Sequence, residues 1–139
     1  MEDRSKKAEA LFAEGYNCAQ AVAVAYADKM GVSEAQAARI ASPFGGGMGK
    51  TRGVCGAVSG MLLVQGGYEG YGDPKAKEEK AAVYDKAREM LEKFKAENGS
   101  VICAALLGLD QNGDKCPPRG KKCGELVRDA AKIVADSLD

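Results

Sequence analysis

The residues of this chain best suited to chemistry are its cysteines: five of them in 139 residues, with no histidine. They are Cys18, Cys55, Cys103, Cys116 and Cys123. Without an imidazole, the sequence excludes Ser-His-Asp and Cys-His nucleophile systems, histidine-ligated zinc and the C-x-x-C-H attachment of haem. Any catalysis must therefore use thiols, carboxylates, lysines or tyrosines.

Four of the five cysteines lie at or near the predicted start of a helix. In chain order these are Cys18 after Asn17, Cys55 after Thr51 and Gly53, Cys103 after Ser100, and Cys123 at the first turn of the last helix. Free N–H groups and the positive end of the helix dipole stabilise a thiolate there. One helix end contributes about 0.3–1 kcal/mol, less than one pKa unit at ~1.36 kcal/mol per unit. A helix start alone therefore leaves a thiol mostly protonated at pH 7.

Basic residues precede two of these cysteines: Lys50 and Arg52 precede Cys55, and Lys121 and Lys122 precede Cys123. A cation together with a helix end predicts a thiol pKa near 7. Cys18 and Cys103 have no such neighbour in sequence. For any single cysteine, packing in the core is the favoured interpretation, whereas four at helix starts favour chemistry. Cys116, in the loop KCPPRGKK, is either outside the pattern or a resolving thiol.

The elements that must position these thiols are all predicted to be helical. Capping boxes, glycines and prolines divide the chain into helices over 4–14, 17–30, 33–42, 55–65, 74–97 and about 101–107, followed by a last amphipathic helix on Leu126, Ala130, Ile133, Val134 and Leu138. The two capping boxes are Asn17 with Gln20 and Ser33 with Gln36. We expect one all-α domain over 1–139, a compact bundle of about five to six helices. An uninterrupted helix through Gly15 is the alternative for the first segment.

The segment CGAVSGMLLVQ is almost uncharged, so it predicts a buried central helix starting near Cys55 and ended by Gly66 and Gly67. Gly56 and Gly60 lie one turn apart and would let another helix pack closely.

The helix predicted over 74–97 has a start signal in Asp73-Pro74, a capping residue followed by proline. Its apolar stripe is predicted at Tyr84, Ala87, Leu91 and Phe94.

Two motifs that suggest other chemistry fail on inspection. FGGGMGKT ends like a phosphate-binding loop, but the opening glycine falls on Phe44 and a helical segment precedes it instead of a strand. DQNGD begins like a calcium loop, but Lys115 and Lys121 occupy the positions of the required glycine and glutamate. We infer that GGGMGKTRG shapes a lip over the Cys55 thiol.

Charge and hydropathy set the expected compartment and partners. Twenty basic and twenty acidic residues cancel, so nothing draws the chain to nucleic acid or anionic lipid. No run approaches the ~18 apolar residues of a membrane span, and MEDRSKKAE lacks the apolar region of a secretory signal. We expect a cytoplasmic protein with no direct membrane insertion.

Taken together, the motifs resemble the C-GCAxxG-C-C family of redox-active proteins. The matching segments, in the family's order, are GYNCAQAV at 15–22, FGGGMG at 44–49, CGAVSG at 55–60, CAALLGLD at 103–110 and the late Cys123. The resemblance covers nearly the whole chain. It implies that Cys18, Cys55, Cys103 and Cys123 are the functional set. It also implies redox activity and, in many members, association with transporter gene neighbourhoods, but it supplies no substrate. Some relatives carry haem-binding segments, which this chain lacks.

These observations predict a thiol–disulfide oxidoreductase that needs no cofactor. Tertiary folding would bring the four cysteines together, and a Cys55 thiolate would attack a small sulfur-containing substrate or a redox partner, with Cys18 or Cys103 resolving the mixed disulfide. An all-sulfur zinc or iron–sulfur site on the same four cysteines is the first alternative, although C-x₂₋₄-C spacing is absent. A non-enzymatic helical partner of a membrane transporter is the second.

Overall fold

The computed structural model describes residues 1–109 and 122–139. Its elements are α1 (Ser5–Glu14), α2 (Cys18–Ala25), η1 (Ala27–Met30), α3 (Glu34–Ala41), η2 (Ser42–Phe44), α4 (Gly45–Met48), α5 (Gly56–Glu69), α6 (Lys77–Asn98), α7 (Cys103–Leu106) and α8 (Cys123–Ser137). Within these ranges every element is helical, apart from an isolated antiparallel bridge between Val54 and Ile102. The predicted all-α class is confirmed.

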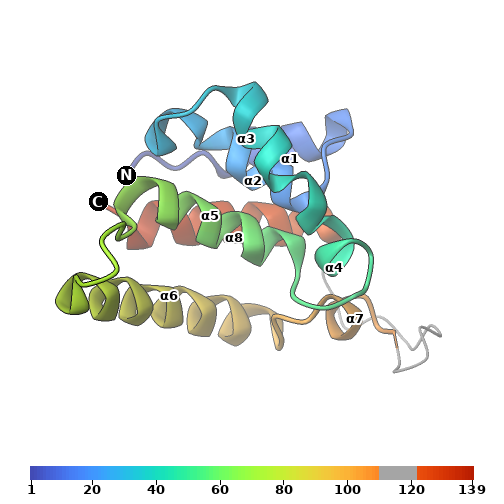
Figure 1. Ribbon diagram of the computed structural model, residues 1–139. Helices are drawn as coiled ribbons and strands as arrows, with labels where there is room; N and C mark the ends of the chain where they lie inside the picture. The colour runs from blue at the N-terminus through green and yellow to red at the C-terminus, as the bar shows by residue number, and fades with distance from the viewer. Residues whose placement is uncertain (110–121) are drawn as a thin grey trace.

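The helices pack around α5, which contacts both α2 and α8 (Figure 1). On one side α1 and α3 pack on α2, and on the other α6 runs along α5 and α8. The short elements α4 and α7 lie together at one end of the bundle, where the first residue of α5 also lies. The predicted buried central helix is therefore α5.

The close packing of α2 on α5 depends on two glycines in α5. A Cβ on Gly60 would lie 2.7 Å from the carbonyl oxygen of Ala19, and one on Gly56 would lie 3.2 Å from the Cβ of Cys18. Gly60 has no room for a Cβ because the α2 backbone lies directly against it, and a Cβ at Gly56 would be tight against both Phe44 and α2. This is the smooth face that the sequence predicts, and it draws Cys18 to the start of α5.

Most predicted helix boundaries are confirmed. Gly15 has a left-handed conformation (φ 119°) and ends α1, so no single helix runs through it. Both capping boxes are formed, Asn17 with Gln20 and Ser33 with Gln36. Gly99, at φ 87°, ends α6 as predicted. Local sequence chemistry is sufficient at these ends, because a cap or a left-handed glycine satisfies backbone groups without tertiary help.

Two predicted boundaries are wrong for physical reasons. The helix α5 continues through Gly66 and Gly67 to Glu69. A Cβ on Gly67 would lie 2.7 Å from the Cβ of Met30, so this glycine serves close packing against η1 and does not end the helix. Asp73-Pro74 forms a turn before α6, in which Asp73 Oδ1 accepts a hydrogen bond from the Lys75 N–H at 2.9 Å.

The predicted apolar stripe of α6 is also partly wrong. Phe94 is fully buried, but the second buried residue is Met90, and Tyr84 is 49% exposed. Tyr84 instead makes an edge-on ring contact with Tyr71. The last helix follows its prediction: all five of its predicted apolar residues are buried, which places the start of α8 against α2 and α5.

Candidate functional site

The four cysteines of the predicted set line one cavity at the end of the bundle, here called the cysteine cavity. Its other lining residues are Gly46, Gly47, Arg52, Gly56, Leu106, Leu107 and Leu126. Its volume is about 40 Å³, little more than the ~30 Å³ share of one water molecule in the liquid. A substrate larger than water must therefore approach the sulfurs from outside the cavity.

Each cysteine stands at a helix start, as the sequence predicts. Cys18, Cys103 and Cys123 are the first residues of α2, α7 and α8, and Cys55 is the residue before α5. Cys55 and Cys103 are buried, whereas Cys18 and Cys123 are partly exposed. The cavity thus has an inner pair and an outer pair of thiols.

The isolated bridge holds the inner pair in place. The Cys55 N–H donates to the Val101 carbonyl at 2.7 Å, and the Cys103 N–H donates to the Gly53 carbonyl at 2.6 Å. These bonds lie on either side of the contact between Val54 and Ile102. The sequence analysis missed this bridge, because an isolated antiparallel contact produces no alternating run of apolar residues.

The outer pair comes from the two ends of the chain. The sulfurs of Cys18 and Cys123 are in side-chain hydrogen-bonding contact. This contact depends on the packing of α2 and α8 against each other and against α5. Two thiols in contact can form a disulfide without a large backbone movement.

A left-handed turn forms the wall of the cavity beside Arg52. Residues 46 to 50 all have positive φ, between 61° and 71°, and Arg52 follows at 63°. For residues other than glycine this conformation costs roughly 1–2 kcal/mol each, and Met48, Lys50 and Arg52 bear that cost. Strain of this kind persists where surrounding structure enforces it and is concentrated at functional sites.

Gly47 is the residue that lets this turn pack closely against the cysteines. A Cβ there would lie 2.7 Å from both the Cys103 Cβ and the Gly53 backbone nitrogen. Turn hydrogen bonds fix the geometry, with the Gly53 N–H donating to the Gly47 carbonyl at 2.8 Å and the Thr51 hydroxyl donating to the same carbonyl at 2.9 Å. The predicted glycine lip therefore lies over the thiols.

Arg52 is the cation of the cavity. Its Nη1 donates to the Cys103 sulfur at 3.8 Å, and its charge also lowers the pKa of Cys123. Lys50, which the sequence analysis paired with Arg52, is exposed and does not line the cavity.

The two outer thiols have opposite pKa shifts. The hydrogen bond with Cys18, assisted by the charge of Arg52, lowers the pKa of Cys123 to about 6. The same hydrogen bond, together with burial, raises the pKa of Cys18. The pair therefore loses its first proton readily and its second with difficulty, as two interacting groups do. The hydrogen bond and the charge of Arg52 both favour the thiolate on Cys123 over the thiolate on Cys18.

The thiolate predicted at Cys55 stays a prediction, and the surroundings of its sulfur disfavour it. Burial raises the pKa of Cys55, and the N–H groups of Ala57 and Val58 at the start of α5 offset only part of that rise. Neither Lys50 nor Arg52 is among the groups that lower it. The Arg52 guanidinium instead donates to the Cys103 sulfur and lowers the pKa of Cys123.

Cys116 lies outside the described residues, as do Lys121 and the DQNGD segment. Over 1–109 and 122–139, no group of three or more His, Cys, Asp or Glu side chains is arranged to hold a metal ion. The four sulfurs as placed therefore do not fit a zinc or iron–sulfur site, even though they share a cavity.

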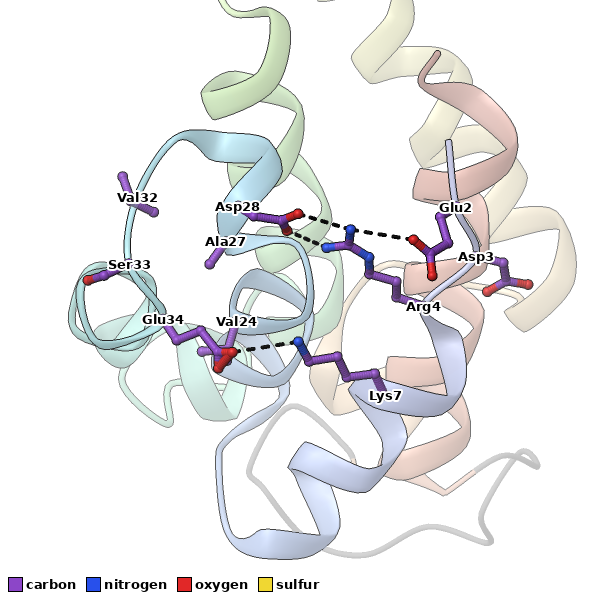
Figure 2. A pocket seen from close by; sticks show the side chains of 10 residues that line it. All are labelled: Glu2, Asp3, Arg4, Lys7, Val24, Ala27, Asp28, Val32, Ser33 and Glu34. Atoms are coloured by element: carbon purple, nitrogen blue, oxygen red, sulfur yellow. Dashed lines mark hydrogen bonds and ion pairs between the residues drawn. The ribbon is translucent and has the colours of Figure 1, made fainter.

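A larger cavity of about 610 Å³, here called the polar pocket, lies between the first residues of the chain, η1 and the start of α3 (Figure 2). Ion pairs cross it. Arg4 pairs with Asp28, and Lys7 lies 3.6 Å from Glu34. It contains no cysteine. The sequence analysis did not single it out, and its charged groups are paired with one another.

None of the helices in the described part of the chain has the length and apolar character needed to cross a membrane.

A family model described as "Putative redox-active protein (C_GCAxxG_C_C)" matches residues 16–137. No curated protein and no solved structure matches the chain.

Proposed function

Because the chain belongs to the C_GCAxxG_C_C family, we propose that it is a thiol–disulfide oxidoreductase in which Cys123 is the attacking thiolate and Cys18 the resolving thiol. The observation that carries this proposal is the contact between the two partly exposed sulfurs. It keeps the four cysteines of the predicted set but makes Cys123, in place of Cys55, the attacking thiol.

The proposed reaction is two successive exchanges. The Cys123 thiolate attacks one sulfur of a disulfide, forms a mixed disulfide and releases the first substrate thiolate, which takes a proton from solvent. The Cys18 thiol then loses its proton and attacks the Cys123 sulfur, so that the second substrate thiol leaves. The substrate gains two electrons and two protons, and the protein is left with a Cys18–Cys123 disulfide. A dithiol reductant reverses these steps to restore the thiols.

Arg52 and Cys18 have distinct parts in this mechanism. Cys18 donates a hydrogen bond that favours the Cys123 thiolate before attack, and it is then in place to resolve the mixed disulfide. Arg52 favours the same thiolate by its charge. The small volume of the cysteine cavity keeps a bulky second reactant away from the inner sulfurs.

The inner pair, Cys55 and Cys103, is proposed to serve as a second dithiol. Both residues line the same cavity as the outer pair. When the outer disulfide forms, a Cys55 thiolate could attack it and Cys103 could resolve the product. The inner pair is then oxidised and the outer pair reduced, with no net change in electrons.

The test is the pH dependence of alkylation at each cysteine, read by mass spectrometry on reduced, metal-free protein. We expect Cys123 to react with an apparent pKa near 6, against about 8.5 for an ordinary cysteine. Treatment with glutathione disulfide should then give a Cys18–Cys123 disulfide. Cys116→Ser is the matched control and should change neither result.

Two outcomes would contradict this proposal. In one, every cysteine titrates at or above about 8.5. In the other, oxidation yields no disulfide among the four cysteines of the cavity. The Cys123→Ser variant separates the proposed roles from the earlier prediction, since fast alkylation at Cys55 in that variant would restore Cys55 as the attacking thiol.

A metal or cluster site on the same four cysteines remains the alternative proposal, with their shared cavity in its favour and their present arrangement against it. Stoichiometric zinc or iron in anaerobically purified protein would favour it.

The transporter partnership and the cytoplasmic location stay predictions. Pull-down with all five cysteines changed to serine would separate a partner role from thiol chemistry.

A further inference from the structure

An apolar groove of about 500 Å³ runs beside the cysteine cavity, along one face of α5. The lining residues used below are Ile40, Phe44, Met48, Ser59, Leu62 and Gly66. Ile40 is 50% exposed and Met48 43% exposed, so apolar surface remains open to solvent. The volume lies within the ~300–1,000 Å³ typical of pockets for small ligands.

One polar atom stands out in this apolar lining. The Ser59 side chain is 7% exposed, and its hydroxyl has no hydrogen-bond partner among the described residues. Leaving a buried hydroxyl unpaired costs about 1–3 kcal/mol. A ligand carrying one hydrogen-bonding group would satisfy it, whereas a wholly apolar helix face laid in the groove would not.

Two elements contribute residues both to the groove and to the cysteine cavity. Cys55, Ser59, Leu62 and Gly66 follow one another at the spacing of a single helix face. The left-handed turn contributes Gly46 and Gly47 to the cavity, and Met48 to the groove. Met48 is one of the residues held at positive φ. The strained turn therefore forms part of the wall of both the cysteine cavity and the groove.

We propose that this groove is a binding site for a small, mostly apolar molecule that carries one hydrogen-bonding group, which contacts the Ser59 hydroxyl. The concave apolar lining supplies affinity, and the single buried hydroxyl fixes the orientation of the ligand. The thioether of Met48 adapts readily to different shapes. This proposal is independent of the proposed redox function, because none of the groups that it uses is a thiol.

The test uses N-phenyl-1-naphthylamine, a neutral apolar dye with one N–H group whose fluorescence rises in apolar surroundings. We expect saturable binding at one site per chain. Ser59→Ala should weaken binding about 3- to 10-fold, the factor that corresponds to losing one hydrogen bond. Because the probe is not a sulfur compound, failure of the redox proposal would leave this result unchanged.

Gly66 offers a matched pair of variants. A Cβ added at Gly66 meets nothing within 4 Å, so Gly66→Ala should bind the dye within about twofold of the natural protein, whereas Gly66→Phe should fill the groove and weaken binding at least ~10-fold. Both changes replace a helix-interior glycine, so neither should lower helix content by circular dichroism.

Three outcomes would overturn the proposal. The first is the absence of saturable binding by the natural protein. The second is equal binding by the natural protein and a folded Gly66→Phe variant, which would place the dye elsewhere. The third is a natural protein that is dimeric by analytical ultracentrifugation and a Gly66→Phe variant that is monomeric, which would make the groove an interface between copies of the chain.

Discussion

The cysteine cavity and the polar pocket differ in size, in burial and in how their charged groups are paired. The polar pocket is the larger, about 610 Å³ against about 40 Å³, yet its charged side chains are solvent-exposed or paired with each other. In the cysteine cavity, buried sulfurs lie beside one cation, in a wall of left-handed backbone. The larger cavity is therefore not the one that gathers the thiols.

The two regions also differ in the size of the energetic contributions that their residues make. Exposed ion pairs of the polar pocket are screened and contribute roughly 0–1 kcal/mol each. The turn beside the cysteines places three non-glycine residues in a conformation that costs roughly 1–2 kcal/mol apiece, and the contacts around it must offset that cost. We therefore expect substitutions at the cysteine cavity to have large effects and substitutions at the polar pocket to have small ones.

The largest effect is expected for Gly47→Ala. The added Cβ would meet the Cys103 Cβ and the Gly53 nitrogen at 2.7 Å, at a φ of 71°. Left-handed strain of ~1–2 kcal/mol and overpacking of ~1–3 kcal/mol together predict a loss of roughly 2–5 kcal/mol in the free energy of unfolding, measured by urea denaturation. Gly49→Ala is the control, since Gly49 has φ 61° and nothing within 4 Å. It should lose only about 1–2 kcal/mol, and equal losses would contradict the close packing of Gly47.

The next effect is expected for Cys18→Ala, which removes the hydrogen-bond donor to Cys123. A hydrogen bond to a charged group contributes about 1.5–3 kcal/mol, so the apparent pKa of Cys123 should rise from about 6 by roughly one to two units. The alkylation rate of Cys123 against pH measures this. Cys18→Ser retains a donor and should raise the pKa less. An unchanged pKa in Cys18→Ala would show that the contact with Cys18 does not stabilise the thiolate.

A smaller effect is expected for Arg52→Gln. The charge of Arg52 lowers the pKa of Cys123, but it is a weaker cause than the hydrogen bond from Cys18. We expect the apparent pKa of Cys123 to rise by less than about one unit, and to rise less in high salt because the natural interaction is already screened. Lys50→Gln is the control and should leave this pKa unchanged. A larger shift in Lys50→Gln than in Arg52→Gln would reverse our assignment of the cation.

The smallest effect is expected in the polar pocket, for Asp28→Asn. The hydrogen bond from Arg4 lowers the pKa of Asp28 from 3.8 to about 2. A depressed folded-state pKa means that the carboxylate stabilises the fold above pH ~4 and that this contribution is lost as the pH falls through about 2. Asp28→Asn should therefore cost at most about 1 kcal/mol at pH 7, and its difference from the natural protein should shrink between pH 4 and pH 2. A difference that persists at pH 2 in urea denaturation would contradict the pairing.

Much of the fold could be predicted from the sequence because its signals are local. Asn17 with Gln20, Ser33 with Gln36 and the glycines at 15 and 99 fix helix ends through bonds within a few residues. The predictions failed where a residue acts across the fold. Gly67 looked like a helix end but permits close contact with Met30, and Tyr84 looked buried but lies on the outer face of α6.

For the site, the sequence by itself determined which residues are available and that Cys18, Cys55, Cys103 and Cys123 stand at helix starts. Only the tertiary structure decided their partners. Cys18 meets Cys123 because α2 and α8 pack together, and Arg52 faces Cys103 and Cys123 because the left-handed turn directs it there. A thiol pKa depends on burial and on charges within a few ångströms. Those distances are set by packing between segments far apart in the chain. Nearness in sequence to Lys50 and Arg52 therefore could not identify Cys123 as the thiol whose pKa Arg52 lowers.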